Sequence, residues 1–268
     1  MTKFTGLILA ASRKGPDDEV AKLQGVSHKC LVEIDGEVML ERVIRELKAS
    51  ANIERIFVSI ESEDLLKATP RLAEMLAAGD IAFMPSADNL FLSVSTAIDE
   101  IESPFPMIIS TGDNALHTTE MIDHFASQFS ASTDDVSVAM TPADVILKAY
   151  PDGKRAFHEL KDGGWSSCNL YGLRSDAALT AAKVFETGGQ FGKRPQRIMK
   201  AFGLTFMLKY KYKQATLDQL AEHLSQRWKL QISAIRMPFA DAPIDVDNPG
   251  DFERSERILQ ARRETATS

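Results

Sequence analysis

The sequence predicts an α/β fold in which helices cover both faces of a mostly parallel sheet. Short apolar runs alternate with amphipathic segments from residue 4 to residue 140, and this alternation is typical of successive strand–helix units. Of the 268 residues, 44% are hydrophobic, which is enough to build a sizeable core. Because no internal repeat or low-complexity linker interrupts the sequence, we expect a single domain over residues 1–268.

The strands are predicted by continuous apolar runs that are too brief for a typical helix. The run at residues 31–34 also ends on Asp35-Gly36, a strong turn signal. In chain order, we expect strands at residues 4–11, 31–34, 53–60, 81–84, 105–110, 136–140 and 232–237.

The helices are predicted by apolar side chains that recur at helical spacing. The clearest stripe is formed by Met39, Leu40, Val43, Ile44 and Leu47, and it predicts a helix that ends near residue 50. In chain order, we expect helices at residues 39–50, 63–78 with a break at Pro70, 90–101, 118–129, 175–185, 217–228 and 249–261.

Two stretches depart from this regular alternation. Residues 12–29 are mostly polar and contain Gly15, Pro16 and Gly25, so we expect a long loop there. Loops of that length without regular structure are uncommon and tend to be functional. Residues 143–173 predict β-like pieces separated by turns, which makes the second half of the domain less regular than the first.

Composition excludes several classes of function. The formal net charge of −7 argues against a general DNA or RNA binder, which needs a basic face to release counterions. The two cysteines, Cys30 and Cys168, match no zinc spacing and suit a reducing compartment. The start of the sequence lacks the features of a signal peptide, and no stretch approaches the roughly 20 apolar residues of a membrane span. We therefore expect a cytoplasmic protein with no nucleic-acid partner.

The loop after the first strand is the first candidate for ligand binding, because sheets of this type bind ligands beyond the carboxyl ends of their strands. Backbone donors in such a loop can surround phosphate oxygens. Lys14 and Lys29 are suitable cations, and Arg13 can bind two oxygens at once. The alternative is a surface loop with solvated charges.

Three aspartates form the second candidate. Asp113 lies in the TGDNAL segment that follows the strand at residues 105–110, where a carboxylate can hold a magnesium ion that bridges ligand phosphates. Asp245 and Asp247 lie on the same side of the chain if their segment is extended. Two carboxylates about 4 Å apart repel by roughly 4 kcal/mol at an effective dielectric of 20, so a close approach of Asp113 and Asp247 implies a divalent cation between them. The alternatives are a helix cap at Asp113 and a solvated acidic turn at residues 245–247.

The order of four segments resembles that of the MobA-like nucleotidyltransferases. The family pattern LAGGxGxRM corresponds to LILAASRKG here, and PKxLxxxxGxPMLxRV corresponds to HKCLVEIDGEVMLERV at residues 28–43. The family's gDxPLl and nVNTPeDL correspond to GDNALH at residues 112–117 and DVDNPGDF at residues 245–252. The resemblance implies a Rossmann-like three-layer α/β sandwich of the nucleotide-diphospho-sugar transferase type.

The resemblance also implies roles for individual residues. Lys29 matches the lysine that contacts nucleotide phosphates, and Asp113 matches the metal-binding aspartate. Asp247, or alternatively Asp245, matches the late polar residue that completes the metal site. Arg13 is the further catalytic candidate. The residues expected to line the nucleotide site are Ala10, Ala11, Ser12, Lys14, Gly15 and Ser93.

The sequence also departs from the family pattern. Ala11 and Ser12 stand where two glycines are usual, and His28 replaces the proline that precedes the lysine. In addition, Arg13 and Lys14 cannot both match the single arginine of the family motif.

The function implied is a Mg²⁺-dependent nucleotidyltransferase that transfers NMP from an NTP to a phosphorylated small-molecule acceptor and releases pyrophosphate. Residues 1–140 would then bind the nucleotide, residues 141–240 the acceptor, and residues 241–262 would close the metal site. Polar residues of the second part are candidate acceptor contacts: Ser167, Asn169, Arg174, Lys154-Arg155 and Lys193-Arg194. The alternatives are a GT-A-like glycosyltransferase that consumes a nucleotide sugar, and a nucleotide-binding regulator without catalysis.

Overall fold

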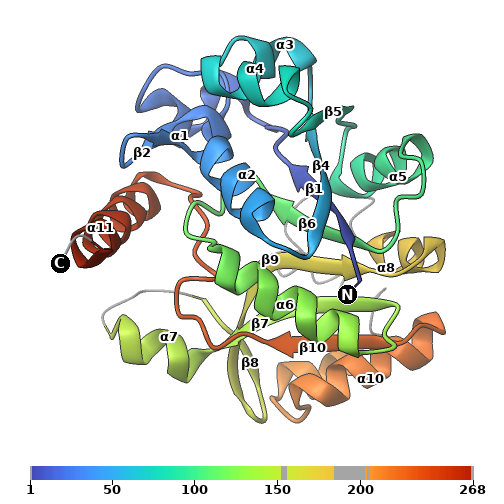
Figure 1. Cartoon of the computed structure of the whole chain (residues 1–268). Coiled ribbons are helices and arrows are strands. Elements are labelled where there is room, and N and C mark those ends of the chain that lie inside the picture. The colour runs from blue at the N-terminus through green and yellow to red at the C-terminus, as the bar shows by residue number, and fades with distance from the viewer. Residues whose placement is uncertain (1, 152–155, 184–202, 204–205, 267–268) are drawn as a thin grey trace.

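A mostly parallel sheet of eight strands runs through the centre of the computed structural model, which describes residues 2–151, 156–183, 203 and 206–266 (Figure 1). Seven strands follow one another in the order β10-β7-β9-β6-β1-β4-β5, and β8 pairs with β9. The strands are β1 (Phe4–Leu9), β4 (Ile53–Ile60), β5 (Ala82–Pro85), β6 (Met107–Thr111), β7 (Val136–Pro142), β8 (His158–Leu160), β9 (Gly163–Leu173) and β10 (Ile232–Arg236).

The sheet confirms the predicted fold class. β1 pairs in parallel with β4 and β6, β4 with β5, and β7 with β10. Helical crossovers link parallel strands because the chain must return to the same edge before the next strand starts. β9 is the exception, since it lies between β6 and β7 and is antiparallel to both.

Helices cover both faces of the sheet, as predicted. They are α1 (Glu19–Lys22), α2 (Met39–Ala49), α3 (Glu63–Lys67), α4 (Pro70–Ala77), α5 (Leu90–Glu100), α6 (Thr119–Ala131), α7 (Ala143–Ala149), α8 (Leu179–Ala182), α10 (Leu217–Trp228) and α11 (Pro249–Ala266), with 3-10 turns η1 (Gly15–Asp17), η2 (Lys29–Leu31) and η3 (Asp176–Ala178). None of the helices in the described part of the chain is long and apolar enough to cross a membrane.

The two faces of the sheet are buried by different helices because successive strand residues point to opposite sides. Ile8 and Ile108 pack in the core that contains most of the buried residues of α2 and those of α4 and α6, which lie on one face. Leu7 and Ile109, their neighbours along the same strands, pack with α5 and α8 on the other face. β1 and β6 are thus buried on both sides, which explains why their sequences are mostly apolar and do not alternate between apolar and polar residues.

Three segments differ from the sequence prediction. Residues 12–29 are not one irregular loop, because they contain η1, α1 and the start of η2. Residues 143–173 begin with the helix α7 rather than a β-like piece. The strand expected at residues 31–34 is reduced to β2 (Glu33–Ile34), which forms a hairpin with β3 (Glu37–Val38) around the Asp35-Gly36 turn. Helices such as α1 and α7 complete fewer than two turns, so they give the sequence no clear periodicity.

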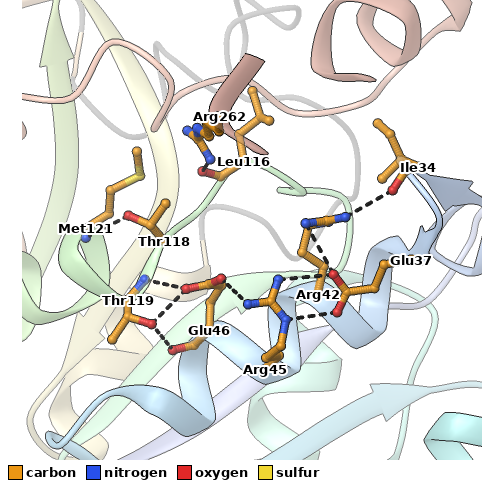
Figure 2. A network of polar contacts seen from close by, with 10 residues as sticks. All are labelled: Ile34, Glu37, Arg42, Arg45, Glu46, Leu116, Thr118, Thr119, Met121 and Arg262. Atoms are coloured by element: carbon orange, nitrogen blue, oxygen red, sulfur yellow. Dashed lines mark hydrogen bonds and ion pairs between the residues drawn. The ribbon is translucent and has the colours of Figure 1, made fainter. Parts of the chain in front are cut away.

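A network of polar contacts fixes the loop that joins β6 to α6 (Figure 2). Glu46 of α2 accepts hydrogen bonds from the backbone N–H and the hydroxyl of Thr119, at 2.8 and 2.7 Å, so its carboxylate lies at the N-terminus of α6. Arg262 of α11 donates to the carbonyl of Leu116, at 3.1 Å. Arg45 joins Glu46 to Glu37 of the β2–β3 hairpin. The loop between Thr111 and Thr118 is therefore anchored by α2 and α11.

Candidate functional site

The candidate site lies where β1 and β6 end side by side. The N–H of Gly112, the first residue after β6, donates to the carbonyl of Leu9 at the end of β1, at 2.9 Å. A Cβ at Gly112 would lie 3.2 Å from the Cβ atoms of both Ala10 and Cys30. The absence of a side chain at this glycine therefore lets the loop that carries Asp113 lie close to the loop that carries Lys29.

Lys29 occupies the centre of the site. Its Nζ lies 2.6 Å from Oδ2 of Asp113 and 2.7 Å from Oδ1 of Asp247. The three side chains come from η2, from the loop after β6 and from the segment before α11. The structure therefore brings together the lysine and two of the aspartates that the sequence analysis singled out, although they lie far apart in the chain.

The charges at the centre of the site are strongly coupled. The Lys29 side chain is 21% exposed, and those of Asp113 and Asp247 are 17% and 42% exposed. Burial by itself would lower the pKa of Lys29, but the negative charges of Asp113 and Asp247 outweigh it and raise this pKa above its usual value. Lys29 is therefore an ammonium ion that neutralises part of the charge of the two carboxylates.

A polar chain connects this centre to β9. The hydroxyl of Thr111 donates to Oδ1 of Asp113 at 2.5 Å and also lies against Asn114. Asn169 of β9 donates to Oδ1 of Asn114 at 3.2 Å and to Oδ2 of Asp245 at 3.3 Å. Asp245 thus contacts Asn169, whereas Asp247 contacts Lys29.

The backbone of Asn169 supports a special role for this residue in the site. Asn169 has a positive φ of 53°, which is uncommon outside glycine, and it lies in the part of β9 where the register with β7 shifts. A bulge of this kind redirects a side chain. The sequence predicts Asn169 only as one of several candidate acceptor contacts, because nothing local distinguishes it from other polar strand residues.

The loop after β1 is held by a residue that the sequence analysis did not single out. Oε1 of Glu61 accepts a hydrogen bond from the N–H of Ser12 at 2.8 Å, and its Oε2 lies 2.9 Å from Nε2 of His28. Glu61 is the first residue after β4, and Asp113 is the second residue after β6. The rule that drew attention to Asp113, a carboxylate close behind a buried strand, could therefore have found Glu61 too.

The other nucleotide-loop candidates are placed as follows. The hydroxyl of Ser12 accepts a hydrogen bond from the N–H of Gly15 at 2.9 Å, and Gly15 has a φ of +53°. Ala10 is buried and Ala11 is exposed. Arg13 and Lys14 are exposed, and their side chains form no hydrogen bond or ion pair with the residues that the structure describes. Their contact with a nucleotide stays a prediction.

Ser93 is buried in α5, where its hydroxyl accepts from the N–H of Ala87 at 2.9 Å and donates to the carbonyl of Ala87 at 3.3 Å. These bonds show that Ser93 fixes the loop between β5 and α5; its place beside a base stays a prediction. Of the acceptor candidates, Arg174 donates to the carbonyls of Asp134 and Phe129 and so has a structural role. The pairs at 154–155 and 193–194 lie outside the described residues.

Asp113 and Asp247 are suitable ligands for magnesium. Mg²⁺ prefers oxygen donors and is commonly bound by one or two carboxylates together with substrate phosphates, rather than by a cage of protein side chains. The described residues contain no group of three or more His, Cys, Asp or Glu side chains that could hold a metal ion by themselves. The expectation that a close approach of Asp113 and Asp247 implies a divalent cation between them is wrong, because the ammonium of Lys29 lies against both carboxylates. The binding of Mg²⁺ by these two residues stays a prediction.

The family model of the MobA-like NTP transferase domain matches residues 6–227. The chain belongs to this family. The match begins in β1 and ends in α10, so it includes Lys29, Asp113 and Asn169 within one family domain. No curated protein matches the sequence.

Solved structures show the same fold. A hypothetical transferase from Thermus thermophilus has 21% identity and a TM-score of 0.74, with 94% of this chain and 100% of that chain covered. A 4-diphosphocytidyl-2C-methyl-D-erythritol synthase from Anaerococcus prevotii has 11% identity and a TM-score of 0.57, with 97% and 99% covered. A CMP:2-keto-3-deoxy-manno-octonic acid synthetase complexed with CTP has 13% identity and a TM-score of 0.55, with 97% and 100% covered. At these identities the likeness establishes the fold, while the family match supports NTP transferase activity.

Proposed function

We propose that this member of the MobA-like family is a Mg²⁺-dependent nucleotidyltransferase. It would transfer NMP from an NTP to a phosphorylated small molecule and release pyrophosphate. The observation that carries the proposal is the position of the Lys29 ammonium between Asp113 and Asp247, at the carboxyl end of the parallel sheet. An ammonium and two carboxylates at this edge can together bind a triphosphate and its cation.

The reaction needs positioning and charge neutralisation more than proton transfer. An oxygen of the acceptor phosphate attacks the α-phosphorus, while the bond from that phosphorus to the oxygen bridging it to the β-phosphate breaks. The electron pair of that bond leaves with pyrophosphate. No general base is required, because an acceptor phosphate is already ionised near neutral pH. His117, the histidine nearest to Asp113 in sequence, is buried. Its Nε2 and Nδ1 contact the carbonyl of Ala242 at 3.0 Å and the hydroxyl of Ser110 at 3.5 Å, so both ring nitrogens are occupied by protein groups.

Each residue of the site has a distinct part in this scheme. Lys29 donates hydrogen bonds to phosphate oxygens and offsets the charge that builds up in the transition state. Asp113 and Asp247 would hold Mg²⁺, which supplies charge neutralisation on the phosphates when it is bound. Thr111 and Asn169 orient the carboxylates of Asp113 and Asp245 through hydrogen bonds.

The proposal is tested in two steps. A thermal-shift screen of ATP, GTP, CTP and UTP, each with Mg²⁺, identifies the nucleotide, because a ligand that binds the native state raises the melting temperature. CTP is the first choice, since one neighbour of this fold was solved with CTP. The selected NTP is then incubated with a panel of sugar phosphates and other phosphorylated alcohols, and pyrophosphate is measured.

Release of pyrophosphate that depends on the acceptor, and its loss in Asp113→Asn, is the expected result. Hydrolysis of a nucleotide sugar in place of NTP turnover would identify a glycosyltransferase. Nucleotide binding without turnover over the whole panel would favour a regulator.

A further inference from the structure

We propose that Glu61 is a positioning residue that closes the loop of residues 12–28 and thereby places Lys29. This inference rests on the proposed function. Its starting point is that Ser12 and His28, two positions at which the sequence departs from the family pattern, are bound by the same carboxylate. One oxygen of Glu61 accepts from the N–H of Ser12 at 2.8 Å, and the other lies 2.9 Å from Nε2 of His28.

Glu61 lies at a rigid point of the fold. It directly follows β4, whose last three residues, Val58, Ser59 and Ile60, are fully buried. Val58 and Ser59 pair with both β1 and β5, and Ile60 pairs with β5. The loop, in contrast, begins after β1 and ends at η2, and its two short helical turns contribute few buried side chains. Glu61 therefore ties both ends of the loop to the sheet.

The backbone at His28 explains why a side-chain contact is needed there. His28 has a φ of −139°, far from the value near −65° to which a proline ring restricts the chain. The path into Lys29 is therefore not one that the proline of the family pattern could adopt. The imidazole is held instead at both nitrogens, by Glu61 and, through Nδ1, by the hydroxyl of Ser27 at 3.0 Å. The ring is 10% exposed, so its orientation is fixed by these contacts and by packing.

The contact between Glu61 and His28 affects the site because His28 and Lys29 are adjacent in the sequence. His28 is the N-cap of η2 and Lys29 is its first residue, so the ring that Glu61 binds belongs to the residue next to the ammonium-bearing lysine. Loss of this anchor would let the backbone at residue 29 sample more conformations, and the ammonium would meet a nucleotide in the right position less often. The N–H of Ser12 is already bonded to Glu61, so phosphate-binding amides in this loop must come from its other residues.

The variants Glu61→Ala and Glu61→Gln distinguish the hydrogen bonds that the Glu61 side chain accepts from the effect of its negative charge. Glutamine keeps an oxygen for the N–H of Ser12, and its amide can donate to Nε2 of His28 when the ring carries its proton on Nδ1. Glu63→Ala is the matched control, because Glu63 is an acidic residue only two positions from Glu61. Within the part of the chain that the structure describes, the Glu63 carboxylate pairs only with the exposed Lys67. His28→Ala removes one of the two anchors and supplies a second variant if Glu61→Ala folds poorly.

The first readout is amide hydrogen exchange over residues 11–30 in the absence of nucleotide. We expect the exchange rate in this segment to rise about tenfold in Glu61→Ala, because loss of a hydrogen bond to a charged group changes an equilibrium by about tenfold. The rate should rise by a smaller factor in His28→Ala. In Glu61→Gln and Glu63→Ala it should remain within about twofold of the wild-type rate. Exchange in Glu61→Ala equal to that in Glu63→Ala would overturn the proposal. Exchange in Glu61→Gln as fast as in Glu61→Ala would also overturn it.

The second readout is the affinity for ATP, GTP, CTP and UTP, each measured with Mg²⁺ by calorimetry. Glu61→Ala should weaken the binding of the preferred nucleotide about tenfold and raise its KM more than it lowers kcat, with Glu61→Gln close to wild type. If wild-type protein binds none of the four nucleotides, the proposed function fails, while hydrogen exchange still decides the role of Glu61. If a nucleotide binds equally well to Glu61→Ala and to wild type, the positioning role fails and the proposed function stands.

Discussion

Replacing Lys29 with methionine is expected to have opposite effects on the two ligands of the site. Binding of a divalent cation to the nucleotide-free protein should become stronger, whereas binding of an NTP should become weaker. The reason is that the ammonium of Lys29 now lies against the two carboxylates, Asp113 and Asp247, that a cation would use. A cation that arrives without a nucleotide must therefore displace the ammonium.

The size of the effect follows from the geometry. Ion pairs between partly exposed groups contribute up to about 1 kcal/mol each, and the 42% exposure of Asp247 places its pair with Lys29 in that class. Loss of both ion pairs thus removes about 1–2 kcal/mol of the free energy with which the Lys29 ammonium competes against a divalent cation for the two carboxylates. The oxygens of Asp113 and Asp247 that contact the Lys29 ammonium are at most about 5 Å apart. Once the ammonium is removed, the two carboxylate charges repel by about 3 kcal/mol at an effective dielectric of 20. Both changes favour a divalent cation, so affinity should rise at least about tenfold.

The assay is titration of the nucleotide-free protein with Mn²⁺, with free Mn²⁺ followed by electron paramagnetic resonance at pH 8. Lys22→Met is the control, since Lys22 pairs with Asp17 on the surface. Adding Asp113→Asn to Lys29→Met should abolish the gain. Equal Mn²⁺ affinity in Lys29→Met and wild type would refute the argument that the ammonium occupies the cation site.

Three further predictions concern catalysis, pH dependence and packing. Asp113→Asn should lower turnover by about a hundredfold, and EDTA should abolish turnover of the wild type; pyrophosphate release measures both. Burial lowers the pKa of His117 to about 4, below its unfolded value near 6.5, so the unfolded chain takes up the proton first. The free energy of unfolding, measured in urea, should therefore fall as pH decreases from about 6.5 to about 4, by up to about 1.4 kcal/mol per pH unit, and His117→Gln should remove this component. A Cβ at Gly172 would lie 2.6 Å from the ring of Phe129, so Gly172→Ala should cost about 1–3 kcal/mol of unfolding free energy, whereas Gly6→Ala, with its nearest neighbour at 3.4 Å, should cost much less.

Long periodic elements were predicted well because their signal is local. β4 and α10 have the predicted bounds, and the break at Pro70 separates α3 from α4. The short helices α1 and α7 escaped because their few residues bury little: α7 buries Ile146 alone among its residues. Such segments fold where tertiary contacts stabilise them, and propensity cannot reveal those contacts.

The sequence by itself determined the α/β class, the family motifs and the choice of Lys29, Asp113 and Asp247 as candidate site residues. These properties depend on periodicity and on residue order, which the chain carries locally. Only the tertiary structure decided that the three side chains meet, and that Glu61 joins Ser12 to His28. Such contacts join segments distant in sequence, and their geometry depends on strand order, on the left-handed backbone at Asn169 and on the close approach at Gly112, none of which leaves a local pattern.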